Sequence, residues 1–470
     1  MSSEGDVDYK PGNKIAYGIG ATSDGITYQT FTFLVFTFYY AVIGIDVNLV
    51  TIGFILWSIW NAVNDPLLGF ISDKTKTRFG RRTPYIIVSF IPLSLMMFFL
   101  WTPPADNISM SFIYFLLAIM IFDGLYTMNA LNLTALFPEM WLEEDERRSA
   151  NNIRQIFTIV ALLIAFLVPT FLISDFSAST VPQAQVISEY QLTGIILTVV
   201  VAVGYAIAIK WGIRERVEFS DDSLSVPNYW EAFKHTLSNR TFQYFLIANT
   251  CNWYVFGLIP TIIPLYGEYV LNISDSLVLG ILLAAAFLSG AVFLNVWKYL
   301  ADRWENYRRA WISSMVFWAV SLLLFVMVSD QTLALIGFTI MGFGLAGSLL
   351  FRDLVMADII DEDEVQTGVR REGAYFGTNA LIMRLAVIFV FLSIASVFNN
   401  VGWTVFNPLP GAETILGLRV LLGVFPAIAM IIGALAFSRY PLVENKLREM
   451  KKKRNQLHIS KGRKDTVIAD

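Results

Sequence analysis

Long apolar stretches alternate with short polar segments along almost the whole chain. Each apolar stretch has about the 20 residues that a helix needs to cross the hydrocarbon core of a bilayer. Six of them precede residue 212 and six follow residue 241. The pattern therefore predicts an all-α membrane protein with twelve transmembrane helices in two six-helix bundles. The expected spans are 15–43, 49–71, 84–101, 110–137, 152–173, 190–211, 242–270, 277–299, 310–328, 332–357, 374–398 and 414–438.

The two sets of spans repeat a pattern of charges. An Asp-Lys pair and then an Arg-Arg pair follow the second span, and Asp-Arg and then Arg-Arg follow the eighth. Repeated halves are typical of transporters whose two bundles alternate around a site at the midplane of the membrane. The predicted domains are an N-terminal bundle over 1–211, a cytosolic linker over 212–241, a C-terminal bundle over 242–440 and a basic cytosolic tail over 441–470.

Lysine and arginine are confined to alternate connections. They occur in the loops after the second, fourth, sixth, eighth and tenth spans and in the tail, whereas the intervening loops contain neither. Loops rich in these residues stay on the cytosolic side during insertion. We therefore expect a multi-pass protein of the cell membrane with both termini in the cytosol.

The composition argues against nucleic-acid, metal and organic-cofactor partners. Hydrophobic residues make up 56% of the chain and charged residues only 15%, against about 25% charged in soluble domains. The net charge of −4 suggests no nucleic-acid partner. The two histidines lie outside the apolar stretches, and the chain has a single cysteine. We therefore expect no metal and no organic cofactor, only a coupling ion.

One acid lies deep within the second span. Asp65 precedes Asp73, where the polar loop begins, by eight residues, or about 12 Å of helix. A carboxylate at that depth costs about 2.5 to 3.5 kcal/mol unless it is protonated, paired or facing a wet cavity. Asp65 is therefore a candidate for the coupling site. The alternative is that it caps a helix that restarts at Pro66.

Other polar residues of the second and fourth spans fall at helical spacing. Asn61 and Asp65 are four residues apart with Asn64 beside them, and Asp123 and Thr127 are also four apart. Such oxygens could form a site for a small cation or surround a carboxylate that takes up a proton. Because Asn61 adds no negative charge beside Asp65, we favour a proton as the coupling ion. Sodium is the alternative, because Asp123 could supply the second charge. The alternative is that these side chains only join helices.

Candidate substrate-binding residues lie within spans of both halves. Asp24 and Tyr28 share a helical face, where a carboxylate beside an aromatic ring suits a polyhydroxylated ring with one apolar side. The alternative for Asp24 is a hydrogen bond to a neighbouring helix. Arg384 lies deep and needs a counter-ion, for which Asp24 and Asp65 are candidates. Further candidates for the substrate wall are Arg154, Asn249, Trp253 and Asn379.

Charges at the expected cytosolic ends suggest a gate. Acids and paired arginines there could form ion pairs that close this face in one conformation. The alternative is that the basic residues only set the orientation. The gate candidates are Asp73, Arg81, Arg82, Asp302 and Arg308, and Arg352, Asp353 and Asp358 are interpreted as gate or helix-end pairs.

Two runs of sequence resemble a known family. The segments IWNAVNDPLLGFISDKTKTRFGRRTP and ADIIDEDEVQTGVRREGAYFG resemble signatures of the glycoside-pentoside-hexuronide:cation symporters, the melibiose-permease-like branch of the major facilitator superfamily. The resemblance covers nearly the whole chain. It implies a sugar-binding role for Asp24, a cation-site role for Asp65 with Asn64 and Thr127, and basic substrate-site residues at Arg154 and Arg384.

The sequence also departs from that family. Asn61 stands where melibiose permeases have a second cation-site acid, and Ala130 and Thr134 stand where they have a sugar-binding Asp and Trp. These departures argue against a galactoside-type pocket and against sodium.

The favoured function is cation-coupled symport of a sugar or sugar derivative by alternating access. We expect the protein to be a monomer. Its expected partners are a small-molecule substrate, a monovalent cation and the lipid bilayer. The alternative on the same fold is a carrier of a lysolipid or another amphiphile. An enzyme or a receptor is disfavoured, because the sequence has no nucleophile-base pair, metal-ligand cluster, nucleotide-binding loop or soluble domain.

Overall fold

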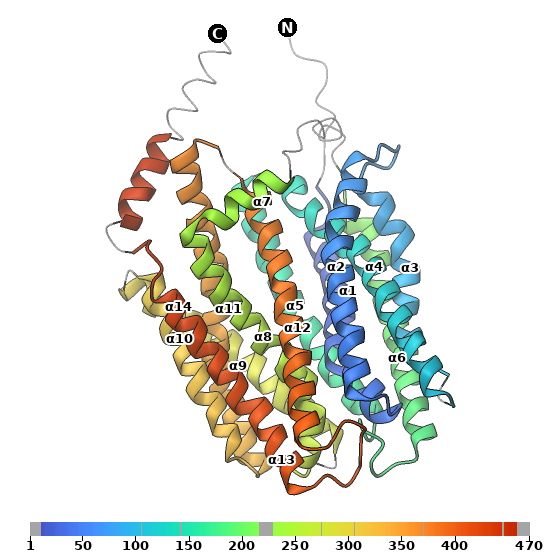
Figure 1. Cartoon of the computed structure of the whole chain (residues 1–470). Helices are drawn as coiled ribbons and strands as arrows, with labels where there is room; N and C mark the ends of the chain where they lie inside the picture. The colour runs from blue at the N-terminus through green and yellow to red at the C-terminus, as the bar shows by residue number, and fades with distance from the viewer. Residues whose placement is uncertain are drawn as a thin grey trace. The chain divides into compact units, whose positions relative to one another are not determined.

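The computed structural model describes residues 11–104, 106–141, 143–215, 229–273, 275–304, 306–369, 371–443 and 446–457 (Figure 1). Within these residues the secondary structure is entirely helical. The helices before the linker are α1 (Lys14–Thr37), α2 (Val47–Lys74), α3 (Thr83–Phe99), α4 (Ile108–Met140), α5 (Glu144–Leu172) and α6 (Gln183–Ile207). The linker contains α7 (Tyr229–Ser238). The helices that follow are α8 (Arg240–Tyr269), α9 (Ser276–Trp304), α10 (Tyr307–Leu323), α11 (Gln331–Thr367), α12 (Glu372–Asn400), α13 (Ala412–Arg419) and α14 (Phe425–Phe437).

Most of the expected spans are helices that can cross a bilayer. Among the described residues, 10 helical stretches are long and apolar enough to do so. The other two predicted spans correspond to α1, which carries Asp24 and several hydroxyl groups, and to α3, which has 17 residues, or about 25 Å of helix. The all-α membrane fold is thus confirmed, although length and hydropathy alone do not give the full count of twelve.

The helix α2 continues through its proline. It runs without a break from Val47 to Lys74, with Pro66 inside it, and its N-terminal cap is Asp46, whose side chain accepts a hydrogen bond from the amide of Asn48 at 2.8 Å. The interpretation of Asp65 as the cap of a helix restarting at the proline is therefore wrong. Asp65 lies within a continuous helix, and its carboxylate needs partners from other helices.

The chain divides into two compact units, which we describe separately. The first, unit 1, comprises residues 1–226, 260–284 and 394–415, and the second, unit 2, comprises 227–259, 285–393 and 416–470. These units are defined by contacts in space, whereas the predicted domains followed the order of the chain.

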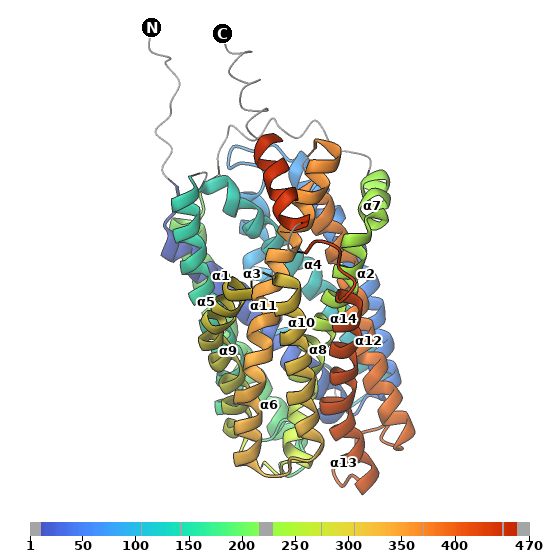
Figure 2. The same ribbon diagram turned by 90° about the vertical axis from the view of Figure 1, so that its left-hand side faces the viewer.

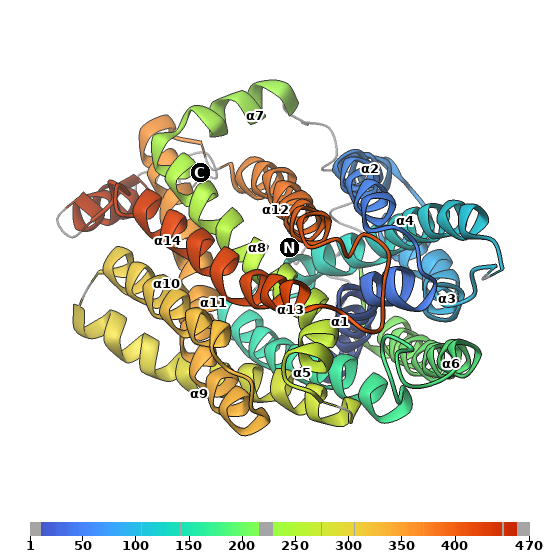
Figure 3. The ribbon, with the colours of Figure 1, turned by 60° about the horizontal axis from the view of Figure 1, so that its bottom comes forward.

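In unit 1, the helix α1 packs against α5 and α6, α3 packs against α4 and α6, and α2 packs against α4 (Figures 1 and 3). Glycines allow α1 to lie very close to α5. A Cβ atom added to Gly25 would lie 2.6 Å from the Cβ of Ala161, and one added to Gly18 would lie 2.5 Å from the ring of Phe157. Small residues allow such close helix contacts in membranes, so these glycines fix the face of α1 that points away from α5.

A hydroxyl cluster holds residues 260–284 in unit 1. Ser177 donates a hydrogen bond to Glu268 at 2.5 Å, and Ser179 donates a second one to the same carboxylate. Asp175 belongs to the same loop. Burial opposes its ionisation, but hydrogen bonds from the amides of Thr180 and Ser177 and from their hydroxyls outweigh burial and hold the pKa of Asp175 below its usual value. The loop after α5 is therefore pinned to the end of α8.

Residues 394–415 join unit 1 through the π-helical turn that follows α1 (Phe38–Val42) and through the start of α2. The hydroxyl of Tyr40 donates to the carbonyl oxygen of Trp403, whose ring packs edge-on against that of Tyr40. The amide of Val47 donates to the carbonyl of Thr404 at 2.8 Å. Loops from both halves of the sequence thus meet at the expected outer ends of these helices.

In unit 2, α10 packs against α11 and α14 (Figure 2). The tail helix, residues 446–457, docks on α11 through two ion pairs, from Lys451 to Asp358 at 3.4 Å and from Arg454 to Asp361 at 2.6 Å. Asp358 therefore forms an ion pair at the end of α11, and its partner comes from the tail.

The orientation of the helices can be tested with two exposed positions. Leu409 is 84% exposed in a loop without lysine or arginine, and Lys234 is exposed on α7 in the linker. In a Cys251→Ser background, an impermeant maleimide should label Leu409→Cys in intact cells and should label Lys234→Cys only after permeabilisation, because basic loops stay inside. Labelling of Lys234→Cys in intact cells would contradict the orientation.

Candidate functional site

Residues of α2 and α4 meet around two carboxylates, Asp123 and Asp65, within unit 1. Asn61 donates a side-chain hydrogen bond to Asp123 Oδ1, and Asn64 donates one to Asp123 Oδ2 at 3.3 Å. Thr127 Oγ1 donates to Asp65 Oδ1 at 2.8 Å. All five predicted cation-site residues are thus assembled in one cluster, which we call the α2–α4 cluster. Their role in cation binding stays a prediction.

The spacing of the α2–α4 cluster follows from helix geometry. Asn61 and Asp65 are one turn apart on α2, as are Asp123 and Thr127 on α4, so the two pairs lie about 5–6 Å apart. Asp123 is only 2% exposed. Asn61 Oδ1 is buried without a hydrogen-bond partner among the described residues. The cluster therefore combines two carboxylates with an amide oxygen that can still accept a ligand.

The chemistry of this cluster suits a small monovalent ion. Hard cations prefer oxygen ligands, and the cluster offers carboxylate, amide and hydroxyl oxygens. In the part of the chain that the structure describes, no group of three or more His, Cys, Asp or Glu side chains is placed to hold a metal ion.

A second polar group on α1 faces α4. The hydroxyl of Tyr126 donates to Asp24 Oδ2 at 3.3 Å, and the ring of Tyr126 stacks on that of Tyr28 with centroids 5.4 Å apart. Asp24 Oδ1 is buried without a hydrogen-bond partner among the described residues. Tyr205 of α6 also interacts with Asp24. The carboxylate therefore has Oδ2 held by Tyr126, while Oδ1 makes no hydrogen bond of normal geometry among the described residues and can accept one from a substrate hydroxyl.

Tyr126 was not among the predicted site residues. It lies three residues after Asp123, so its side chain projects from nearly the same side of α4 as that of Asp123. Its spacing of three residues from Asp123 was the available signal, but a tyrosine in an apolar span is usually a packing residue. The helix α4 therefore contributes Asp123 and Thr127 to the α2–α4 cluster and contacts the Asp24 carboxylate through Tyr126.

Arg154 is positioned by the packing of α5 on α1. Its guanidinium lies 4.9 Å from the centre of the Phe137 ring, a cation–π contact with α4. It also interacts electrostatically with Asp24. The predicted basic residue of the substrate site therefore lies near the predicted substrate acid.

Two of the predicted substrate residues meet in unit 2. Asn249 Nδ2 of α8 donates to Asn379 Oδ1 of α12 at 2.8 Å. Both amides also contact the sulfur of Met383, at 3.4 and 3.1 Å. Asn249 Oδ1 is buried without a hydrogen-bond partner among the described residues. The pair joins α8 to α12 and keeps one amide oxygen available.

Trp253 lies beside an arginine that we interpreted as part of a gate or a helix-end pair. The guanidinium of Arg352 lies 5.2 Å from the centre of the Trp253 ring and also pairs with the exposed Asp353 at 3.1 Å. A small cavity of about 10 Å³ lies between them, lined also by Asn252, Phe256, Trp318 and Ser348. Arg352 is therefore a candidate for the substrate wall that sequence reasoning placed elsewhere.

Arg384 lies on α12, five residues after Asn379, and is partly exposed. Its proposed counter-ions, Asp24 and Asp65, belong to unit 1, whereas Arg384 belongs to unit 2. The pairing of Arg384 with either acid stays a prediction.

The paired arginines after α2 have partners on other elements of unit 1. Arg81 and Arg82 each form an ion pair with Glu139 of α4, at 2.7 and 3.2 Å. The side chain of Glu215 accepts hydrogen bonds from the backbone amides of Arg81, Arg82 and Thr83. Neither glutamate was among the predicted gate residues. The loop between α2 and α3 is thus tied to the end of α4 and to the end of the sixth span.

Within the part of the chain that the structure describes, no ion pair is found for the other three gate candidates, Asp73, Asp302 and Arg308. The side chain of Asp73 lies outside the described residues. In unit 2, Asp302 is exposed, and Arg308 donates to the carbonyl oxygen of Tyr440 at 3.0 Å. Arg308 therefore holds the turn after α14, and an ion-pair gate in this unit stays a prediction.

Comparison with known proteins places the chain in a family. The profile of the family described as MFS/sugar transport protein matches residues 16–444. The chain belongs to this family. The resemblance to cation symporters of the major facilitator superfamily is thereby confirmed. The protein is a transporter and not an enzyme, and such transporters need no organic cofactor.

Similar proteins differ in what they carry. An uncharacterized symporter of Synechocystis is 24% identical, covering 80% of this chain and 82% of its own. The sodium-dependent lysophosphatidylcholine symporter 1 of Gallus gallus is 23% identical, covering 94% of this chain and 88% of its own. Among solved structures, a mutant of the nucleoside transporter NupG matches with a TM-score of 0.65 at 13% identity over 91% of this chain and 99% of its own. The structural match confirms the fold.

The contribution of Thr127 to the α2–α4 cluster can be tested by removing its hydroxyl. Thr127→Val should raise the sodium or proton concentration for half-maximal uptake about tenfold, because a hydrogen bond to a charged group contributes about 1.5–3 kcal/mol. Initial rates of solute uptake measured against each ion give this value. Thr134 is an exposed threonine two turns further along α4. The matched control Thr134→Val should leave the ion concentration for half-maximal uptake unchanged. Equal values for Thr127→Val and the parent would exclude this role.

Proposed function

We propose that the protein is a symporter that couples the downhill movement of a monovalent cation to transport of a sugar or sugar derivative. The observation that carries this proposal is the position of α4, whose Asp123 and Thr127 belong to the α2–α4 cluster while Tyr126 bonds to Asp24. An ion that orders the cluster would also order the tyrosine that holds the substrate acid. Such a shared element is the physical basis of coupling between two ligands.

Sodium is the coupling ion that this geometry favours. The sequence favoured a proton because Asn61 supplies no charge beside Asp65. The hydrogen bonds from Asn61 and Asn64 to Asp123 bring a second carboxylate into the same cluster. A second negative charge offsets much of the cost of removing water from sodium, whereas a proton needs only one acid.

A sugar fits the groups around Asp24. Its hydroxyls can donate to the available Oδ1 of Asp24, and its apolar face can pack on the stacked rings of Tyr28 and Tyr126. The amides of Asn249 and Asn379 and the guanidiniums of Arg154, Arg352 and Arg384 are the remaining candidates for polar contacts. They supply both donors and acceptors, as a polyhydroxylated substrate requires.

A lysolipid is the second candidate substrate, and one feature of unit 2 favours it. An apolar groove of about 520 Å³ opens between α8, α12 and α14. Its lining residues include Leu246, Cys251, Tyr254, Phe389, Phe425 and Ile432. Such a groove could take an acyl chain. Thermal stabilisation of the purified protein by a panel of sugars, with lysophosphatidylcholine as the competing arm, separates the two substrates.

For the cell, we propose a monomer in the cell membrane with both termini in the cytosol, as the distribution of basic loops supports. On that side, the ion pairs of Arg81 and Arg82 with Glu139 connect a cytosolic loop to α4. Movement of α4 during the transport cycle would therefore be transmitted to the cytosolic face.

The substrate role of Asp24 can be tested by removing its charge. Asp24→Asn keeps the shape but loses a charge-assisted hydrogen bond of about 1.5–3 kcal/mol, so affinity for the stabilising sugar should fall ten- to a hundredfold. Ligand-dependent thermal shifts measure this affinity. Asp106→Asn, at an exposed loop position, should bind as the parent does. Unchanged affinity in Asp24→Asn would exclude direct contact.

The coupling role of Asp65 can be tested by separating exchange from accumulation. Asp65→Asn should still exchange labelled solute across vesicles at equal concentrations, since the path remains, but should fail to accumulate it under any ion gradient. The parent should accumulate solute under a sodium gradient. Accumulation by Asp65→Asn at the parental level would place the coupling site elsewhere. A parent that responds only to a proton gradient would show that sodium was the wrong ion.

A further inference from the structure

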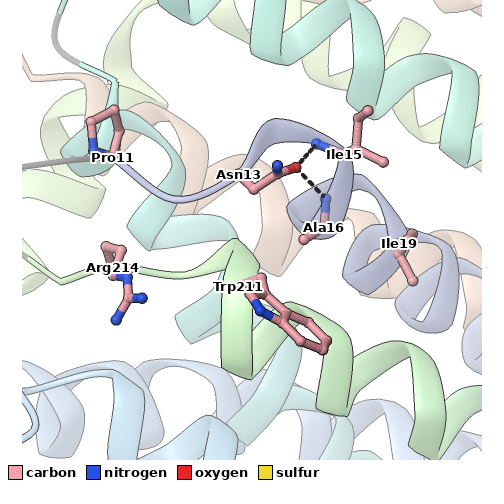
Figure 4. Close-up of a pocket in the computed structure, with 7 residues that line it drawn as sticks. All are labelled: Pro11, Asn13, Ile15, Ala16, Ile19, Trp211 and Arg214. Atoms are coloured by element: carbon pink, nitrogen blue, oxygen red, sulfur yellow. Dashed lines mark hydrogen bonds between the residues drawn. The ribbon is translucent and has the colours of Figure 1, made fainter.

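A groove lies between the start of α1 and the end of the sixth span, within unit 1. It has a volume of about 600 Å³ and is lined by Pro11, Ile15, Ala16, Ile19, Trp211 and Arg214. Figure 4 shows these side chains around the first turn of α1. None of them belongs to the predicted substrate, cation or gate residues, so the groove is separate from the site described above.

Two glycines fix the walls of this groove. A Cβ atom added to Gly12 would lie 1.9 Å from the carbonyl oxygen of Gly212, and one added to Gly212 would lie 2.6 Å from the amide nitrogen of Tyr17. The amide of Asn13 donates to the carbonyl of Trp211 at 2.8 Å. The chain therefore crosses itself here at a distance that only glycine permits. The crossing holds Trp211, in the π-helical turn Ala208–Gly212, against α1.

The groove has an apolar part and a cationic part. In Figure 4 the ring of Trp211 lies on the same side as Ile19, whereas Arg214 lies toward Pro11. The chain enters the membrane along α1 from Pro11 toward Ile19 and leaves it from Trp211 toward Arg214. The apolar part is therefore the deeper one, and the cation lies nearer the aqueous surface.

Further features of the groove match a membrane interface. Trp211 is 50% exposed and Ile15 55% exposed, and exposed tryptophans are enriched at the level of lipid head groups. Lys210 lies over the Trp211 ring at 4.4 Å, and Lys14 precedes Ile15. Arg214 thus lines the groove, and Lys14 and Lys210 are the chain neighbours of its lining residues Ile15 and Trp211. Basic pockets near the cytosolic surface bind anionic head groups.

The N-terminus of α1 does not itself provide the anion site. Asn13 Oδ1 accepts hydrogen bonds from the amides of Ile15 and Ala16 at 2.9 and 3.1 Å (Figure 4). These amides are therefore already satisfied. A bound anion would be held by the guanidinium of Arg214 and by the flanking lysines.

We propose that this groove binds an anionic phospholipid. The phosphate lies at Arg214, and an acyl chain runs along Ile15, Ile19 and Trp211. Ile15 and Asp24 are nine residues apart on α1, which places them on opposite faces of the helix. A lipid bound here contacts the helix that carries Asp24 without entering the substrate site. The charge complementarity of the groove and its exposed apolar lining favour a lipid over a soluble anion.

Tryptophan quenching by brominated lipids tests the proposal. The full chain is reconstituted into phosphatidylcholine nanodiscs that contain increasing fractions of brominated phosphatidylglycerol or brominated phosphatidylcholine. The chain has 12 tryptophans, so the signal of Trp211 is the difference between the parent and Trp211→Phe. We expect brominated phosphatidylglycerol to quench half of this signal at a mole fraction about fivefold lower than brominated phosphatidylcholine needs. A preference of about fivefold is that expected for one basic residue near a membrane surface.

Charge variants separate the site from general attraction to the membrane. Arg214→Gln should lose the preference and Arg214→Lys should keep it, while Lys14→Gln gives a second neutral variant with a reduced preference. The matched control is Arg240→Gln, at an exposed position on α8, and it should retain the full preference.

Three outcomes overturn the proposal. The first is equal quenching of Trp211 by the two lipids in the parent. The second is an unchanged preference for the anionic lipid in both Arg214→Gln and Lys14→Gln. The third is full relief of quenching by millimolar glycerol phosphate, which would assign the groove to a soluble anion.

Discussion

The cost of burying a carboxylate within a membrane protein is the constraint on which the candidate site depends. Asp123 is 2% exposed and accepts hydrogen bonds from both Asn61 and Asn64. A buried acid without such partners would destabilise the fold by several kcal/mol. The requirement therefore fixes how α2 faces α4, and it places Asp65 opposite Thr127 one turn further along. The same contacts that satisfy the acid create a group of oxygens suited to a cation.

The helix α4 connects the candidate functional groups of unit 1. Asp123 and Thr127 complete the α2–α4 cluster, Tyr126 bonds to Asp24 of α1, and Glu139 pairs with the arginines after α2. A rigid helix moves as one body, so a change at any of these contacts is felt at the others. This continuity gives a physical route by which an ion and a solute could favour the same conformation.

Membership of the family settles the class of activity, while substrate choice depends on side chains within the spans. The relatives include carriers with different cargo names on a similar fold. In this chain, our substrate proposal rests on the stacked tyrosines beside Asp24 and on the asparagine pair of α8 and α12. The lysolipid alternative rests on the apolar groove between α8, α12 and α14. Fold alone does not choose among cargoes.

The sequence by itself determined the all-α membrane class, because hydropathy reports directly on length and environment. It also grouped Asn61, Asn64, Asp65, Asp123 and Thr127, because helical spacing places them on defined faces. Only the tertiary structure decided which faces meet. It added Tyr126, Glu139 and Arg352 and brought Asp123 beside Asn61, since partners from distant segments leave no periodic signal. It also showed that α2 passes through Pro66 unbroken, because packing can override the tendency of proline to end a helix.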